Sequence, residues 1–308
     1  MFQILHETHI PFMAIRKRAY IASIALCVIG LASLTLHKGL RLGVDFAGGR
    51  LFEYRFSETM EAEELRDVLS QIGVSGGEVQ EMGAEGHDFI VRIPVSDEEA
   101  AADQAGPSRL FVEKVKELHP GVTAELRKEE LVGPRVGEEL RGKAIKAIVI
   151  SLVLILLYVG VRFEFKFALG GVVALAHDVL ITVFVLSLLD VEFTIPIVAA
   201  LLTIGGYSIN DTVIVFDRIR EQSRQLIGHR LSEVMDNSIN QVLSRTIITS
   251  LTTFLAAGAL YLLGGEVIHD FALTMLIGIL IGTYSSIYVA SALALEIAKN
   301  PIVAPSES

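Results

Sequence analysis

The chain has 308 residues, 52% of them apolar, with a formal net charge of −10 at pH 7 and a mean hydropathy of +0.54. This apolar content is too high for an ordinary soluble domain and predicts several membrane spans. The acidic balance argues against a nucleic-acid partner. The single cysteine, Cys27, excludes a disulfide framework and a thiolate metal cluster, and nothing in the sequence indicates a metal or a cofactor.

Long uncharged stretches recur along the chain, and a helix needs roughly 20 apolar residues to cross a bilayer. Six such helices fit, provided that Asp178 and Asp211 are tolerated inside two of them. The predicted fold class is therefore an α-helical membrane protein with six transmembrane helices. The predicted spans are 19–37, 143–161, 167–189, 193–216, 245–264 and 269–295.

The distribution of basic residues predicts which way the helices run. Arg16, Lys17 and Arg18 precede the first apolar run, which is longer than the 7–15 apolar residues typical of a signal peptide and lacks a good cleavage site. We expect an uncleaved first helix. Lys and Arg are absent from the short loops predicted outside and present in those predicted inside. The termini, 1–18 and 296–308, are thus expected in the cytoplasm and the segment 38–142 on the outer face.

The segment 38–142 has the alternation and helical spacing of one small α+β domain. The order βαββαβ predicts a periplasmic ferredoxin-like sandwich between the first two spans. Gly48 and Gly49 lack the lysine of a phosphate loop and predict a bend or close backbone contact. A loop is expected at 97–107. The strands are predicted at 42–56, 78–82, 89–93 and 122–129, and the helices at 61–72 and 109–118.

The segment 217–244, between the fourth and fifth spans, is too polar to cross a membrane. Its apolar residues recur at helical spacing beside basic residues, which favours a cytoplasmic amphipathic helix. Such a helix can lie on the membrane surface or pack against the protein's own bundle, and the sequence leaves both open.

Asp211 lies inside the fourth span, and Arg245 lies at the very start of the fifth. If these spans form a hairpin, the two side chains can meet as a buried pair of opposite charges. Burial favours the protonated carboxyl and a nearby cation favours the carboxylate, so a movable cation would let Asp211 take up and release a proton. The alternatives are a static ion pair that fixes two helices, and an Arg245 that extends to the membrane surface.

Three further polar residues lie within predicted spans. His177 and Asp178 are near the middle of the third and point about 100° apart on a helix, so they need not act together. Each is either part of a proton relay or a hydrogen-bonded packing residue. Asn210 is expected to bond across helices or to relay protons. Gly205, Gly206 and the pair Gly278 and Gly282 predict close helix approach, with a hinge as the alternative.

Four motifs, taken together, resemble the SecF family of protein-export membrane proteins. They are the run from Gly43 through Asp45, Phe46, Gly48 and Gly49, the Ala176-His177-Asp178-Val179 element, the run from Gly206 through Asp211 to Glu221, and the run from Ser238 through Arg245 to Ser250. Val44 and Ala47 are conservative departures from the first motif.

The resemblance implies six helices with a first periplasmic domain, and membership of the resistance-nodulation-division superfamily. It implies a heterodimer with SecD and an association with the SecYEG channel, the ATPase SecA and the translocating preprotein in the bacterial inner membrane. It also implies that the proton-motive force drives late translocation, with Asp211 and Arg245 as proton-transport residues and no enzymatic activity.

Three rival functions remain open at this point. One is half of a proton-coupled small-molecule exporter of the same superfamily, and another is an assembly scaffold for SecD that conducts no protons. The last is an intramembrane serine protease using Ser208 and His177, although the sequence lacks the glycine that follows the serine in rhomboid-like motifs.

Overall fold

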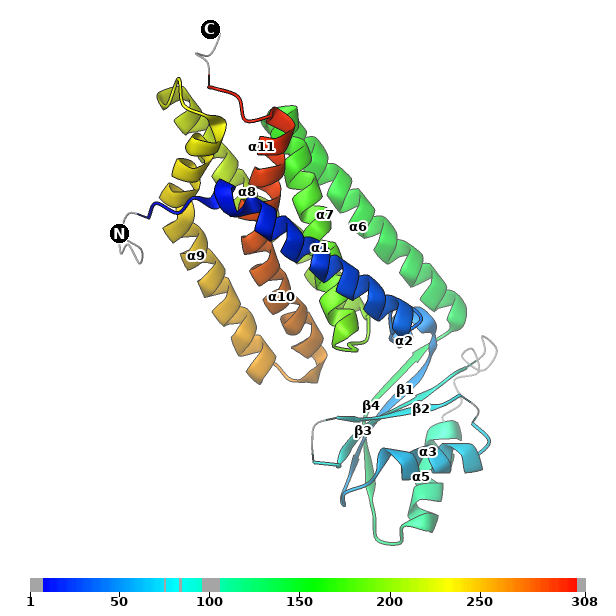
Figure 1. Cartoon of the computed structure of the whole chain (residues 1–308). Helices are drawn as coiled ribbons and strands as arrows, with labels where there is room; N and C mark the ends of the chain where they lie inside the picture. The colour runs from blue at the N-terminus through cyan, green and yellow to red at the C-terminus, as the bar shows by residue number, and fades with distance from the viewer. Residues whose placement is uncertain (1–7, 75, 83–84, 96–105, 304–308) are drawn as a thin grey trace. The chain divides into compact units, whose positions relative to one another are not determined.

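The protein is described by a computed structural model that covers residues 8–74, 76–82, 85–95 and 106–303. The chain forms two compact units, Met1–Arg41 with Ile145–Ser308, and Leu42–Ala144. Figure 1 shows long helices in the first unit and a sheet packed with shorter helices in the second. Most of the loop predicted at 97–107 lies outside the described residues.

The smaller unit has the element order that the sequence predicts. Its four strands form an antiparallel sheet in the order β2-β3-β1-β4. Apolar side chains of the two helices pack with those of the sheet into one core. The elements are β1 (Gly49–Phe56), α3 (Ala62–Gln71), β2 (Glu78–Met82), β3 (Asp88–Ile93), α5 (Gly106–Leu118) and β4 (Ala124–Val132).

The core of this unit is aromatic and contains one buried phenol. Tyr54 of β1 is fully buried and stacks on Phe111 of α5. Its hydroxyl bonds to that of Ser108 at 2.7 Å. Burial raises the pKa of Tyr54 to about 12, and the bond to Ser108 opposes the shift.

The strand predicted at 42–56 is wrong in its first half. Residues Val44–Ala47 form a helical turn, α2, and the strand begins only at Gly49. Gly48 and Gly49 have φ values of 73° and 131°, which favour glycine and produce the predicted bend. A Cβ atom on Gly48 would lie 2.8 Å from the Cα of Pro134, so the predicted close backbone contact is also present.

The described residues contain six helices that are long and apolar enough to cross a membrane, and they lie in the larger unit except for residues 134–144 of the second. The sixth is continuous but changes to a π-helix in its middle, where one extra residue per turn shifts the following side chains. The described helices are α1 (Phe12–Leu36), α6 (Pro134–Arg162), α7 (Phe165–Leu188), α8 (Ile195–Gln225), α9 (Leu231–Leu263), and α10 (Glu266–Ser285) followed by η1 (Ser286–Ser291) and α11 (Ala292–Ala298).

Several helices extend further than the apolar runs predict. The segment 217–244 is not a separate amphipathic helix, because α8 runs to Gln225 and α9 begins at Leu231. Leu231, Met235 and Ile239 are buried in the bundle core, which favours the packing alternative, although Ile227 is 50% exposed. Hydropathy finds the apolar part of a helix and misses polar turns that tertiary contacts support.

The start of α1 is also supported by tertiary contacts, here with side chains of α9. The helix begins at Phe12, inside the stretch 1–18 that was predicted to precede the span. Asp236 of α9 accepts a hydrogen bond from the backbone N–H of Met13 at 2.8 Å, and Asn240 exchanges two bonds with Ile10. These side chains satisfy N–H groups that a helix start leaves unpaired.

Glycines set the spacing between the central helices. A Cβ on Gly278 of α10 would overlap the side chain of Ile204, and one on Gly282 would lie 3.2 Å from the Cβ of Ser208. The predicted close approach is confirmed for these two glycines and is wrong for Gly206, where an added Cβ would have nothing within 4 Å. Gly170 of α7 faces the backbone of η1, where a Cβ would lie 2.6 Å from the carbonyl oxygen of Ala290.

Candidate functional site

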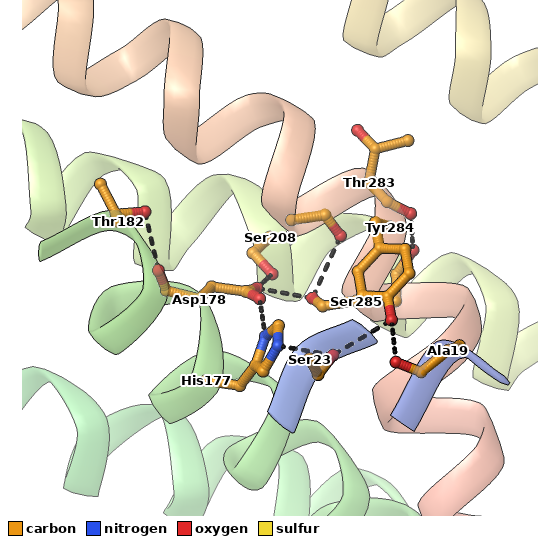
Figure 2. A network of polar contacts seen from close by, with 11 residues as sticks. Ala19, Ser23, His177, Asp178, Thr182, Ser208, Thr283, Tyr284 and Ser285 are labelled. Carbon is orange, nitrogen blue, oxygen red and sulfur yellow. Dashed lines mark hydrogen bonds and ion pairs between the residues drawn. The ribbon is translucent and has the colours of Figure 1, made fainter. Parts of the chain in front are cut away.

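Asp178 of α7 is the centre of a polar network inside the bundle, and its side chain is fully buried. Its Oδ2 accepts hydrogen bonds from the hydroxyls of Ser208 at 2.5 Å and Ser285 at 2.7 Å. Its Oδ1 lies 3.0 Å from Nδ1 of His177. Figure 2 shows these partners converging on the carboxylate from α7, α8 and the end of α10. Three helices are thus joined at one group.

The network continues from His177 toward α1. The Nε2 atom of His177 lies 3.1 Å from the hydroxyl of Ser23, which lies 3.0 Å from that of Tyr284. The Tyr284 hydroxyl donates its only proton to the carbonyl of Ala19 at 2.7 Å, as Figure 2 shows. Ser23 then donates to Tyr284 and accepts from the Nε2–H of His177. The chain of hydrogen bonds therefore connects Asp178 to α1 through His177.

Asp211 of α8 is also fully buried, and its surroundings differ sharply. Within the part of the chain that the structure describes, neither carboxylate oxygen has a hydrogen-bond partner. The hydroxyl of Thr246 on α9 is buried and equally unpaired. Such orphaned buried polar atoms are rare in folded proteins and require an explanation. Asp211 follows Ser208 by nearly one helical turn, so the two polar sites share α8.

Hydroxyl groups lie beside Asp211. Ser250 of α9 accepts a hydrogen bond from the Tyr207 hydroxyl at 3.1 Å and bonds to Thr283 of α10 at 2.7 Å. Ser250 and Arg245 both lie near enough to act on the Asp211 carboxyl. Ser250 therefore connects α8 to α10 through hydrogen bonds.

Arg245 does not form the predicted buried ion pair. Its side chain is exposed, and no ion pair between it and Asp211 occurs among the described residues. The two groups interact only through space in this conformation. The hairpin of α8 and α9 nevertheless brings them to the same region of the bundle, as the sequence predicts.

The remaining predicted residues do not belong to the hydrogen-bond network around Asp178. Asn210 is exposed, and its side chain has no hydrogen bond in the described ranges, so the predicted bond across helices is absent. Among the residues that the structure describes, no group of three or more potential metal ligands is present. The motif residues of the other compact unit, which take no part in this network, are Gly43, Asp45, Phe46, Gly48 and Gly49.

The geometry opposes the serine protease hypothesis. The Ser208 hydroxyl donates to Asp178, and His177 bonds to Asp178 and Ser23 rather than to Ser208. A serine nucleophile requires a base within hydrogen-bonding distance, and these contacts do not provide one.

Sequence reasoning missed Ser23, Tyr284 and Ser285 as members of the Asp178 network. A signal was present in the sixth span, where four consecutive polar or aromatic residues, 283–286, interrupt an otherwise apolar run. The α10 helix ends within this run and the π-helix begins. Such a π-helical segment often marks a functional site.

Family models match most of the chain. The model described as "Protein export membrane protein SecD/SecF, C-terminal" matches residues 112–300, and "SecD/SecF GG Motif" matches residues 34–60. The GG match ends in the smaller unit and includes Gly48 and Gly49.

Similar proteins are known from several bacteria. The Protein translocase subunit SecF of Vibrio alginolyticus is 45% identical over 96% of this chain and 93% of its own length. The Protein translocase subunit SecDF of Thermus thermophilus is 44% identical over 89% of this chain and 37% of its own length.

A solved structure has the same fold. The crystal structure titled as SecDF, a translocon-associated membrane protein, from Thermus thermophilus superimposes with a TM-score of 0.83 at 39% identity. The match covers 97% of this chain and 40% of that one. From the matching motifs, the near full-length identity to SecF proteins and this shared fold, the chain belongs to the SecF group of the SecD/SecF family of protein-export membrane proteins.

Proposed function

We propose that the chain is an accessory subunit of the Sec protein translocase that acts with SecD to couple the proton-motive force to late translocation through SecYEG, after SecA has driven the preprotein in. The observation that carries the proposal is the buried, unpartnered carboxyl of Asp211 beside a hydroxyl cluster and an exposed Arg245. A buried carboxyl without partners favours its protonated form, and a cation brought close favours the carboxylate.

Movement of Arg245 toward Asp211 would therefore drive a proton off the carboxyl. Arg245 itself keeps its charge, because a guanidinium does not lose its proton in proteins. Each charge that crosses a potential of 100 mV supplies about 2.3 kcal/mol, so a few protons can bias a movement of the protein. Helix α9, which carries Arg245, is the element whose displacement would change the distance.

The proposal also includes SecD as the partner and a defined orientation of the chain in the membrane. A relative in which SecD and SecF are one chain supports SecD as the partner. The positive-inside pattern supports cytoplasmic termini in a bacterial inner membrane, with the βαββαβ unit as a ferredoxin-like domain on the periplasmic side. That position would let the domain meet the emerging preprotein.

The test is export of a secreted precursor in cells whose only copy carries Asp211→Asn. The matched control is Asp190→Asn, the same substitution at an exposed carboxylate between two spans. Protein level and co-purification with SecD are measured in parallel. The proposal predicts that the Asp211→Asn complex assembles and that the proton-dependent stage of export is lost, whereas the control exports normally.

Normal export by assembled Asp211→Asn protein would contradict the proton role and favour the scaffold hypothesis. Normal export combined with loss of resistance to a small toxic compound would instead favour the exporter hypothesis.

A further inference from the structure

A cavity of about 630 Å³ lies at one end of the helical bundle, where α6 turns into α7. The C-terminal end of α8 and the segment 301–303 complete its wall. That segment is fixed by backbone bonds, since Gly228 donates to the carbonyl of Val303 and Leu231 to that of Pro301, each at 2.9 Å. Neither Asp178 nor Asp211 lines this cavity, so it is separate from the site above.

The lining of the cavity is strongly basic. Four cations and only one carboxylate, Glu164, contribute to it, and the cations are Arg162, Lys166, Arg220 and Arg224. Arg162 pairs with Asp217 at 3.0 Å, and Lys166 pairs with Glu164 at 2.7 Å. These two cations are therefore already neutralised by protein carboxylates.

Arg220 and Arg224 are different, because no ion pair to either occurs within the described ranges. Both are exposed and lie four residues apart on α8, so they are neighbours on one helix face. Like charges at this spacing destabilise a helix unless an anion lies between them. The start of α7 also contributes the positive end of a helix dipole.

The cavity lies at the junction of two candidate membrane spans, α6 and α7. Arg162 is the last residue of one span, and only residues 163–164 separate it from the next. Next to these lining residues, Val161 is 91% exposed and Phe165 is 78% exposed, so an apolar surface adjoins the basic cavity. A free phosphate would use only the basic part, whereas a phospholipid would use both.

We propose that this cavity binds the headgroup phosphate of an anionic phospholipid between Arg220 and Arg224, with the acyl chains against the surface formed by Val161 and Phe165. Guanidinium groups recognise phosphate through paired, charge-assisted hydrogen bonds. Basic pockets at the ends of transmembrane helices are suited to such headgroups. The bound lipid would also contact the segment 301–303 and so link the C-terminal end to α8.

The experiment measures lipid retention by the purified full chain with native mass spectrometry, using phosphatidylglycerol as the probe and phosphatidylcholine as the neutral reference. The test variant is Arg220→Gln/Arg224→Gln. The matched control is Lys17→Gln/Arg18→Gln, which removes two exposed cations from the start of α1. Thermal unfolding of each variant establishes that it is folded.

Each Lys or Arg near an anionic membrane contributes about fivefold in affinity, so the test variant should bind phosphatidylglycerol roughly 25-fold more weakly. The control should bind within about twofold of the wild type, because its charges lie outside the cavity. Binding by the test variant equal to wild type would overturn the proposal.

Two further arms separate a lipid from a free phosphate. Inorganic phosphate is titrated as a competitor, and Val161→Ser/Phe165→Ser is tested with both probes. The proposal predicts that this variant weakens phosphatidylglycerol binding and leaves phosphate competition unchanged. If phosphate binds as tightly as phosphatidylglycerol and the variant changes neither, the cavity is a phosphate site and the lipid proposal is wrong.

Discussion

Asp178 and Asp211 are two fully buried carboxyl groups in one bundle, and their surroundings are opposite. Asp178 accepts hydrogen bonds from two serines and faces His177, whereas both oxygens of Asp211 are unpaired in the described structure. A group with every partner in place resists a change of charge, because a change would leave those partners unpaired. A group without partners changes charge with little rearrangement. We therefore propose that Asp178 stabilises the bundle and that Asp211 is the group that exchanges a proton.

The largest effect on stability is expected from Asp178→Ala. The change leaves His177, Ser208 and Ser285 without their acceptor inside the bundle, and breaking such a buried charged network costs about 3–5 kcal/mol. The measurement is the unfolding free energy of the detergent-solubilised protein. Asp211→Ala is the matched control, since it removes an equally buried carboxyl that has no partner. Equal losses of unfolding free energy in the two variants would contradict the difference that we infer between Asp178 and Asp211.

Gly170→Ala should have the next largest effect. A methyl group there would meet the backbone carbonyl of Ala290, which cannot rotate away, and would separate the helix of Asp178 from the segment that follows Ser285. Overpacking of this kind costs about 1–3 kcal/mol.

Gly206→Ala is the control for this change, because nothing lies within 4 Å of its added methyl group. Alanine is the better helix former, so this variant should be as stable as the wild type or more so. A Gly170→Ala protein that unfolds at the wild-type temperature would show that the helices are less tightly fixed around Asp178 than the structure indicates.

Ser208→Ala tests the stabilising role of the Asp178 network with a smaller expected loss of stability. It removes one of the two hydroxyl donors to Asp178 and should cost about 1 kcal/mol, while export continues. Ser223→Ala is the control, because that hydroxyl bonds only within its own helix, to Ile219, and its loss should change stability little. Complete loss of export by stable Ser208→Ala protein would contradict the packing role and reopen the question of a nucleophile.

The smallest change in stability is expected from Asp211→Asn. No hydrogen bond to the protein is lost, and the penalty for burying a charge is removed, so the unfolding free energy should stay within about 0.5 kcal/mol or rise. A loss of unfolding free energy comparable to that of Asp178→Ala would show that Asp211 has a stabilising partner in the folded protein. Asp211 would then have a structural role like that of Asp178.

The number of spans and the order of elements in the smaller unit follow from apolar runs and alternation, which are local properties of the sequence. The strand β2 begins and ends where the pattern predicts, whereas α8 and α9 extend beyond their apolar parts because distant contacts support their polar turns. The hydrogen-bond partners of Asp178 cannot be predicted from the local sequence either. Its donors, Ser208 and Ser285, lie 30 and 107 residues away, and a sequence without the fold does not bring them together.

The orientation of the Arg245 side chain also cannot be predicted from the sequence. Motif and hairpin geometry predict its proximity to Asp211, but a long side chain at a helix start can point inward or to the surface at similar free energy. The structure has the outward arrangement. The inward arrangement is the second state that the proposed cycle requires.

The central claim, that Asp211 exchanges a proton and Asp178 does not, is tested most directly by infrared spectroscopy of the complex with SecD reconstituted in membranes. The protonated carboxyl C=O band is followed as pH is changed. The account predicts a buried carboxyl band that titrates in the wild type, persists in Asp178→Asn and disappears in Asp211→Asn. A titrating band that survives in Asp211→Asn and is lost in Asp178→Asn would contradict this claim. It would show that Asp178 is the carboxyl group that exchanges the proton.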